Sequence, residues 1–360
     1  MELADICRAA VRAGASDIHI KAGQPPLVRL HGELRPMGKL PPLTAKDAGE
    51  MALKIMTEAQ RNRFKVDREL DFGWPVEGLG RFRVNVYWQR SLIGMALRAI
   101  PDTVTSLDEL NLPVVLKQVA QAQHGLVLVT GATGSGKSTT LAALVEEINR
   151  TRAAHILTIE DPIEFSFTDR RSVINQREVG SDTRTFATAL RAALRQDPDI
   201  ILVGELRDAE TVEVALQAAE TGHLVLSTLH TVDAADTVSR LIGFFPPHQH
   251  AQIRTLLAHN LQAVVSQRLI PTLANTRVAA VEILLNKGNI PECLADATRF
   301  KEITDLMAKG STQYGSQTFD QAIYRLIQKK LIAVDVGLRF ANNPDDLQLR
   351  LSGIGADGWA

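Results

Sequence analysis

The chain has 360 residues, of which 45% are hydrophobic and 22% charged, with a formal net charge of −1. This length predicts two or three domains, and the near-neutral charge gives no electrostatic reason to expect nucleic acid as a partner. The two cysteines, Cys7 and Cys293, stand far apart and suggest neither a disulfide framework nor a zinc site. Without a run of roughly 20 apolar residues or a signal-peptide pattern, the sequence predicts a cytoplasmic protein with no transmembrane segment.

The first hundred residues combine strand and helix patterns. Four segments alternate polar and apolar residues, as strands with one buried face do: residues 16–21, 27–34, 69–74 and 80–90. Gly32 marks a hairpin or bulge, and Thr44 is a candidate N-cap for a helix over residues 45–56. These patterns predict a small α+β domain with an antiparallel sheet.

The strand predicted at residues 80–90 has two unlike faces. Phe82, Val84, Val86 and Trp88 share one face, and the opposite face carries polar side chains that include Arg81 and Arg83. Two arginines on an exposed face are what an arginine finger requires, because stabilising spread negative charge is the main need of phosphoryl transfer. A solvated basic face is the alternative interpretation.

After a polar, proline-punctuated linker at residues 101–113, the pattern changes to repeated strand and helix units. Buried strands are predicted at residues 126–130, 155–159, 200–203 and 224–228, and helices at residues 114–123, 139–149, 185–195 and 211–221. Alternation of this kind indicates an α/β domain with a largely parallel, covered sheet.

The rest of the chain shows weaker patterns. Apolar residues over residues 250–269 recur at helical spacing and predict a core-facing helix. A strand follows at residues 277–285, then short helices to about residue 349 and a frayed end over residues 352–360. The predicted domains are therefore residues 1–100, a linker at 101–113, an α/β core at 114–285 and a helical region at 286–360.

The segment GATGSGKS at residues 131–138 stands between a predicted buried strand and a predicted helix. This context makes the pattern GxxxxGK[ST] a phosphate site rather than an ordinary glycine turn. Backbone N–H groups at the start of a helix would surround the phosphates, the lysine would reach the β and γ phosphates, and the next hydroxyl would bind Mg²⁺. The predicted cofactor-binding residues here are Gly131, Ala132, Thr133, Gly134, Ser135, Gly136, Lys137, Ser138 and Thr139.

Acidic residues follow two of the predicted strands. Three carboxylates lie in residues 158–164 (TIEDPIE), the last being Glu164, although acidic residues after a strand are also common in solvated loops. Residues 200–205 end in Gly204 and Glu205, like a Walker B strand with glycine where aspartate is usual. Glu205 is therefore the predicted carboxylate for the Mg²⁺ shell and the attacking water.

Two histidines flank the last of these strands. His223 precedes it and His230 follows it, within residues 221–230 (TGHLVLSTLH). A lone histidine in such a place is usually a structural hydrogen-bonding group. When two histidines flank one strand of a nucleotide-binding domain, a role at the nucleotide and a structural role are about equally supported.

Four sequence motifs resemble those of the secretion ATPases: residues 131–138, 158–164, 204–205 and 221–230. Within that superfamily the chain is similar to the retraction ATPases of type IV pili, the PilT and PilU group. The resemblance extends over nearly the whole chain, through residues 16–19 (SDIH), 80–83 (GRFR), 176–180 (QREVG), 194–199 (LRQDPD) and 317–321 (QTFDQ). It implies a PAS-like N-terminal domain, a RecA-like core, and a homohexamer with nucleotide between the two domains.

The resemblance also implies roles for individual residues. ATP and Mg²⁺ are the implied cofactors, held by Lys137 and Ser138, with Glu205 supporting metal and water. Glu164 is implied as general base, and His230 as sensor of the γ phosphate. His223 joins the cofactor-binding set, and Arg81 and Arg83 stand where the family places arginines that face the phosphates.

The implied partners are an inner-membrane pilus platform protein and a second pilus ATPase, with the hexamer at the inner face of the inner membrane. Residues 292–302 lack the C-terminal motif of the Ala-Ile-Arg type associated with retraction, and the tail at 343–351 is closer to PilU, so an accessory motor is an open alternative. Secretion or conjugation motors share the boxes. A scaffold that binds ATP without useful turnover is a further alternative, against which the retained Glu164 and Glu205 argue.

Overall fold

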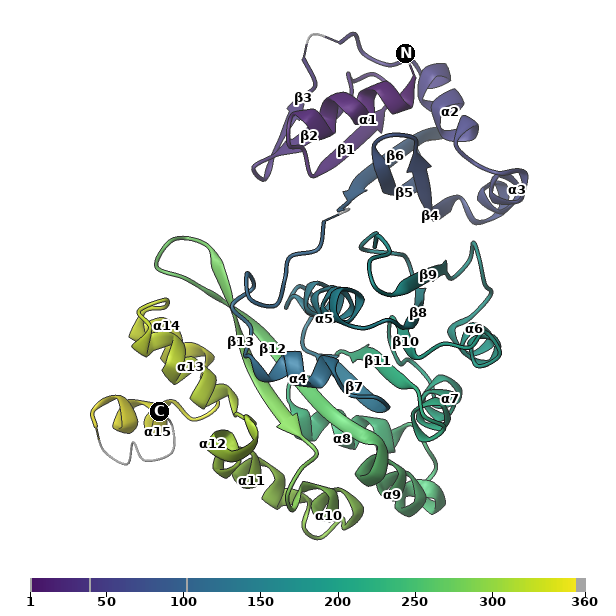
Figure 1. Ribbon diagram of the computed structural model, residues 1–360. Helices are drawn as coiled ribbons and strands as arrows, with labels where there is room; N and C mark the ends of the chain where they lie inside the picture. Colours follow the sequence, from purple (N-terminus) through teal and green to yellow (C-terminus); the bar gives the residue numbers. More distant parts are fainter. Residues whose placement is uncertain (1, 39, 102, 354–360) are drawn as a thin grey trace. The chain divides into compact units, whose positions relative to one another are not determined.

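The computed structural model describes residues 2–38, 40–101 and 103–353, and the chain divides into two compact units (Figure 1). The first comprises Met1–Thr103 with Asp161–Thr168, and the second comprises Val104–Glu160 with Asp169–Ala360. The predicted fraying of residues 352–360 falls mostly on residues 354–360, which lie outside the described residues. Within the described ranges, no helix combines the length and apolar character needed to cross a membrane.

The N-terminal unit is an antiparallel sheet packed with helices. Its strands run in the order β3-β2-β1-β6-β5-β4. Their bounds are β1 Asp17–Lys21, β2 Leu27–Leu30, β3 Glu33–Pro36, β4 Glu69–Val76, β5 Gly80–Gln89 and β6 Leu92–Ile100, and the helices are α1 Leu3–Arg12, α2 Ala45–Lys54 and α3 Glu58–Asp67. Thr44 forms the predicted cap, because its side chain accepts from the Asp47 N–H and the Asp47 carboxylate accepts from the Thr44 N–H. On β5, Phe82, Val84 and Val86 are buried in the core of this unit as predicted.

The second unit contains a seven-stranded sheet in the order β13-β12-β7-β11-β10-β8-β9. Every neighbouring pair is parallel except β12 with β13. The strands are β7 Gly125–Thr130, β8 His155–Glu160, β9 Val173–Glu178, β10 Ile200–Val203, β11 Leu224–Leu229, β12 Leu261–Pro271 and β13 Arg277–Leu285. The predicted fold class, a mainly parallel α/β domain preceded by a small α+β domain, is confirmed.

Helices connect these strands and cover the sheet. They are α4 Val115–Ala120, α5 Lys137–Thr151, α6 Phe186–Ala193, α7 Ala209–Glu220, α8 Ala234–Gly243, the 3₁₀ turn Pro247–Gln249 and α9 His250–Asn260. Strands β7, β10 and β11 are buried along their whole length, which explains their continuous apolar runs. Parallel pairing brings the carboxyl ends of β7, β11, β10 and β8 to one edge of the sheet.

The C-terminal helices pack in the same unit, beside β12 and β13 (Figure 1). They are α10 Ile290–Ala295, the 3₁₀ turn Phe300–Glu302, α11 Ile303–Lys309, α12 Ser311–Tyr314, α13 Phe319–Gln328, α14 Val334–Phe340 and α15 Pro344–Leu351. Phe319 and Ile323 of α13 are fully buried against Ile270 and Ala280 of the two strands. The C-terminal helices therefore share a core with the β12–β13 hairpin.

The prediction of one helix over residues 250–269 is wrong. Helix α9 ends at Asn260, and Leu261 turns to an extended backbone with ψ of 129°. From there the chain forms β12, which pairs parallel with β7 and antiparallel with β13. Because this strand is covered on both faces, its apolar residues do not alternate, and their spacing fits a helix equally well.

Candidate nucleotide site

The glycine loop follows β7 directly and ends where α5 begins at Lys137. Gly131 and Gly136 both have positive φ, 143° and 92°. A Cβ on Gly131 would lie 2.5 Å from the Gln267 carbonyl oxygen, and one on Gly136 would lie 2.8 Å from Nε2 of the same residue. The positive φ therefore favours glycine at both positions, and at Gly131 the backbone of β12 also leaves no room for a side chain.

Within the loop, the lysine is folded back onto its own backbone. Lys137 is buried, and its Nζ donates to the carbonyl oxygens of Gly131 at 2.8 Å and Ala132 at 3.0 Å. The Ser135 hydroxyl is also buried and has no hydrogen-bond partner among the described residues. A buried hydroxyl without a partner is costly, and phosphate oxygens accept from hydroxyl and ammonium groups alike. The loop residues therefore fit a phosphate group.

The remaining predicted loop residues are more open. Ala132, Thr133 and Gly134 are exposed at the turn of the loop, and Ser138 and Thr139 are half-buried in the first turn of α5. These positions agree with a loop that presents its backbone to a ligand. The role of Ser138 as a Mg²⁺ ligand stays a prediction.

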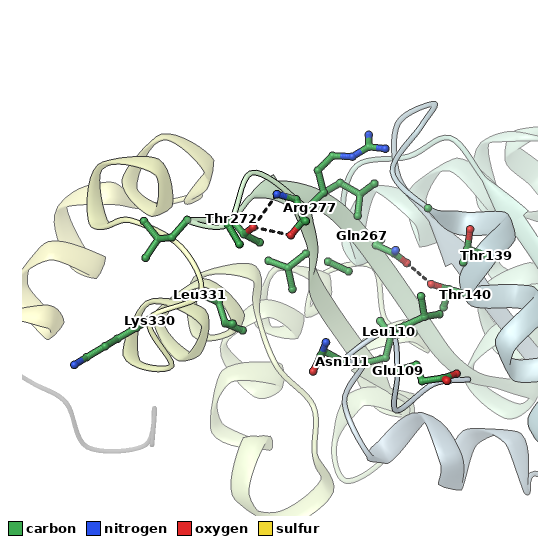
Figure 2. Close-up of a pocket in the computed structure, with 18 residues that line it drawn as sticks. Glu109, Leu110, Asn111, Thr139, Thr140, Gln267, Thr272, Arg277, Lys330 and Leu331 are labelled. Atoms are coloured by element: carbon green, nitrogen blue, oxygen red, sulfur yellow. Dashed lines mark hydrogen bonds between the residues drawn. The ribbon is translucent and has the colours of Figure 1, made fainter. Parts of the chain in front are cut away.

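A pocket of about 580 Å³ lies beside the start of α5 (Figure 2). Its lining comes from the loop and α5, from β12 and β13 with their connecting turn, and from two short segments: Gly136, Thr139, Thr140, Gln267, Leu269, residues 272–274, residues 276–279, residues 109–112, Lys330 and Leu331. Thr140 and Gln267 close its inner end, where the Thr140 Oγ1 donates to the Gln267 Oε1 at 2.9 Å. The pocket was not predicted from the sequence, because residues far apart along the chain form its lining.

Glu205 and His230 meet at the carboxyl ends of β10 and β11. The His230 Nε2 lies 3.2 Å from the Glu205 Oε2, and the Arg207 guanidinium forms an ion pair with the other carboxylate oxygen. The structure thus brings together two residues that were predicted from separate boxes. Arg207 was not singled out from the sequence, although its place two residues after Glu205 was a usable signal.

Within one chain, His223 lies at the opposite end of β11 from the phosphate loop, and its assignment to the cofactor-binding set stays a prediction. Leu224 pairs with Gly125 at the start of β7, and Leu229 pairs with Thr130 at its end. Six strand residues, about 20 Å, separate the start of β11 from the edge that carries the phosphate loop. His223 instead hydrogen-bonds the Ala218 carbonyl oxygen through Nδ1 at 2.9 Å, the structural role weighed as its alternative.

Three predicted site residues belong to the N-terminal unit. Glu164 lies in the segment 161–168, which groups with that unit, and the Ser166 N–H donates to the Pro101 carbonyl oxygen. The Arg81 guanidinium lies against Gly73, so that a Cβ at this position would displace the arginine side chain. Arg83 faces Asp71, with the Nε 3.8 Å from a carboxylate oxygen. Their roles at the phosphates stay predictions.

Few protein side chains are available to bind a cation, which is usual for Mg²⁺ at a nucleotide. In the described part of the chain, no group of three or more histidine, cysteine, aspartate or glutamate side chains is arranged to hold a metal ion. Mg²⁺ in nucleotide sites keeps several waters and takes its other ligands from phosphates and one or two side chains. Ser138 and Glu205 are the predicted contributors from this chain.

Replacing Gly136 by alanine should weaken ATP binding by about tenfold or more. The added Cβ would meet Gln267 at 2.8 Å, and the φ of 92° is strained for any L-residue, at a cost of about 1–3 kcal/mol. Gly222→Ala is the matched control, since its φ of 105° is also positive but nothing lies within 4 Å of the new Cβ. Titration with a fluorescent ATP analogue checks this, and equal affinities in the two variants would contradict it.

In the second unit, a central strand of a mainly parallel sheet leads into a glycine loop with a buried lysine, and a glutamate and a histidine stand at the ends of neighbouring strands. This combination defines a P-loop ATPase domain. Residues 2–332 match the family described as "Type II/IV secretion system protein", and the chain belongs to this family.

Relatives of known name resemble the chain over nearly its whole length. The type IV pilus retraction ATPase PilT of Pseudomonas aeruginosa is 44% identical, over 96% of this chain and 100% of that protein. The type IV pilus ATPase PilU of the same organism is 42% identical, over 98% and 91%. A crystal structure described as the pilus retraction motor PilT with bound ADP matches 97% of this chain and 99% of its own, at 42% identity and a TM-score of 0.89.

Proposed function

We propose that this chain is an ATP-hydrolysing motor that powers retraction of type IV pili. The observation that carries the proposal is the buried, glycine-built phosphate loop, within a chain 44% identical to PilT over that protein's full length. We further propose the homohexamer, the inner-membrane platform protein and the second pilus ATPase as its partners, and a peripheral location at the cytoplasmic face of the inner membrane.

ATP would occupy the loop and the adjoining pocket. The Lys137 ammonium, now bonded to Gly131 and Ala132, would turn to the phosphates, and the Ser135 hydroxyl would gain the acceptor that it lacks. The apolar lining at Leu269 and Val278 suits a base, at the mouth of a loop that binds anions. Bound Mg²⁺ would supply charge neutralisation at the β and γ phosphates.

The chain's own side chains would then perform hydrolysis. Glu205, which contacts His230 and Arg207, would orient water near the phosphates, and His230 would respond to the γ phosphate. Glu164 would remove the proton from the attacking water, and Arg81 and Arg83 would stabilise charge that develops on the phosphates.

The test is a count of surface pili by electron microscopy. Cells that lack the gene, and cells that carry Lys137→Ala, should be immobile and show an excess of pili, because assembly continues while retraction stops. Bald cells would instead indicate assembly or export. Unchanged numbers would indicate an accessory motor, an alternative that 42% identity to PilU favours.

A further inference from the structure

A buried carboxylate on β13, Glu282, receives backbone hydrogen bonds from two helix N-termini. Its side chain is 4% exposed. The Ala234 N–H, at the first residue of α8, donates to its Oε1 at 2.8 Å, and the backbone of Phe319, the first residue of α13, also hydrogen-bonds the carboxylate. Helix N-termini favour negative charge, so each helix start stabilises the same carboxylate. Glu282 therefore joins two helices that are 85 residues apart in sequence.

One of these helices continues from the histidine of the nucleotide site. His230, which contacts Glu205, is followed by Thr231, Val232 and the N-cap Asp233, and α8 begins at Ala234. A shift of the α8 N-terminus would therefore move the loop that holds the histidine.

Buried hydroxyls fix the same loop to the strand that precedes the phosphate loop. The Thr231 Oγ1 lies 2.7 Å from the Thr237 Oγ1. The Thr237 hydroxyl donates to the Asp233 carbonyl oxygen at 2.6 Å and lies 3.4 Å from the Oγ1 of Thr130, the last residue of β7. Thr130 in turn lies 2.8 Å from the Ser266 Oγ, and Ser266 is paired with Glu282 across β12 and β13. The histidine loop is thus held to β7 by hydroxyls and to the C-terminal helices by one carboxylate.

The other helix begins the last part of the C-terminal region. Just before α13, Gln317 exchanges two backbone hydrogen bonds with Ile283, the residue after Glu282. The Arg268 guanidinium lies 3.8 Å from the centre of the Phe319 ring, and it donates to the Phe340 carbonyl oxygen at the end of α14. The carboxylate therefore stands at the junction between the nucleotide site and helices α13 and α14.

We propose that Glu282 is a positioning residue of the ATP site, which holds the His230 loop through α8 and couples its position to α13. This inference rests on the proposed ATPase function and deepens it. A movement of the C-terminal helices would then change the position of His230 at the ATP site, through Glu282 and α8.

A buried carboxylate lowers the stability of the fold more than an uncharged side chain would, so a structural role alone does not explain Glu282. Burial raises the pKa of Glu282 to about 7, although both backbone bonds and Arg268 lower it. The charged groups around it are Asp233, Arg268 and, beyond Arg268, Asp320 of α13. Since the folded-state pKa exceeds the ordinary value of 4.5, the stability contributed by this group is complete below pH 4.5 and is lost as the pH rises through about 7.

The variant Glu282→Gln distinguishes the effect of Glu282 on the stability of the fold from its effect on ATP hydrolysis. The amide cannot ionise, so the stability of the variant relative to the wild type should increase between pH 5 and pH 8, as thermal unfolding measures. A neutral amide oxygen is a weaker acceptor than a carboxylate for the two backbone donors, so at pH 8 kcat should fall by about tenfold to a hundredfold while KM stays nearly constant. Glu146→Gln, a buried carboxylate bonded to Asn149 and Arg170 in α5, is the control and should keep the wild-type kcat.

A double-mutant cycle tests the route through the histidine. If Glu282 acts through His230, Glu282→Gln should lose its effect on kcat in a His230→Ala background, whereas additive losses would overturn the proposal. Ala234→Pro serves if Glu282→Gln fails to fold, since it removes the N–H that donates to Glu282 at a helix position that tolerates proline, and it should lower kcat similarly. A folded Glu282→Gln with wild-type kcat would also overturn the proposal; a wild type without ATPase activity would overturn the proposed function instead.

Discussion

Lys137→Ala should reduce ATP hydrolysis by at least about a hundredfold to a thousandfold, the loss that accompanies removal of a preorganised charge donor from a transition state. The ammonium is buried at the start of α5 and donates to the loop's own carbonyl oxygens of Gly131 at 2.8 Å and Ala132 at 3.0 Å. Steady-state phosphate release by the purified protein measures the effect.

Lys117→Ala is the matched control for this experiment. Lys117 is a lysine of the same unit, but it is partly exposed and forms a surface ion pair with Asp108 at 2.6 Å. Surface pairs of this kind contribute only about 0–1 kcal/mol to stability. Its loss should therefore leave hydrolysis unchanged, and a Lys137→Ala protein as active as the Lys117→Ala protein would remove the phosphate-loop assignment.

The sequence predicts the centre of the fold well because burial there leaves a simple pattern. Strands β7, β10 and β11 are short apolar runs, and the helices between them carry an apolar stripe, so period and length identify both. The pattern fails at β12. This strand follows α9 without a break, and Val264 and Val265 are both buried, so no alternation distinguishes strand from helix.

The site divides in the same way. Lys137, Glu205 and His230 were found because each belongs to a local motif, and the last two lie within 3.2 Å of each other because the strand ends share one edge. The sequence places His223 and His230 at the two ends of one strand, and the structure brings His230 to Glu205, whereas His223 bonds the Ala218 carbonyl oxygen. Glu282 and the pocket beside α5 were missed, since their partners are separated by tens to hundreds of residues and a buried carboxylate within an apolar strand carries no motif.

Glu164→Gln should keep nucleotide binding and lose turnover, by about a hundredfold to ten-thousandfold, because an amide cannot accept the proton of the attacking water. The acidic box offers a close comparison in Glu160, whose Oε1 accepts hydrogen bonds from Thr158 at 2.6 Å and Gln176 at 3.1 Å. That carboxylate has internal partners in the second unit, whereas Glu164 belongs to the segment that groups with the N-terminal unit. Single-turnover hydrolysis and ATP affinity should be measured for both variants.

If Glu164 is the base, Glu164→Gln should bind ATP with the wild-type affinity but hydrolyse it slowly, whereas Glu160→Gln should hydrolyse it at the wild-type rate. A Glu164→Gln protein with wild-type turnover, beside a Glu160→Gln protein that has lost it, would transfer the role to Glu160 at the end of β8. The base would then come from the same unit as the phosphate loop. If only the Glu164→Gln protein loses turnover, the base comes instead from the segment Asp161–Thr168, which groups with the N-terminal unit.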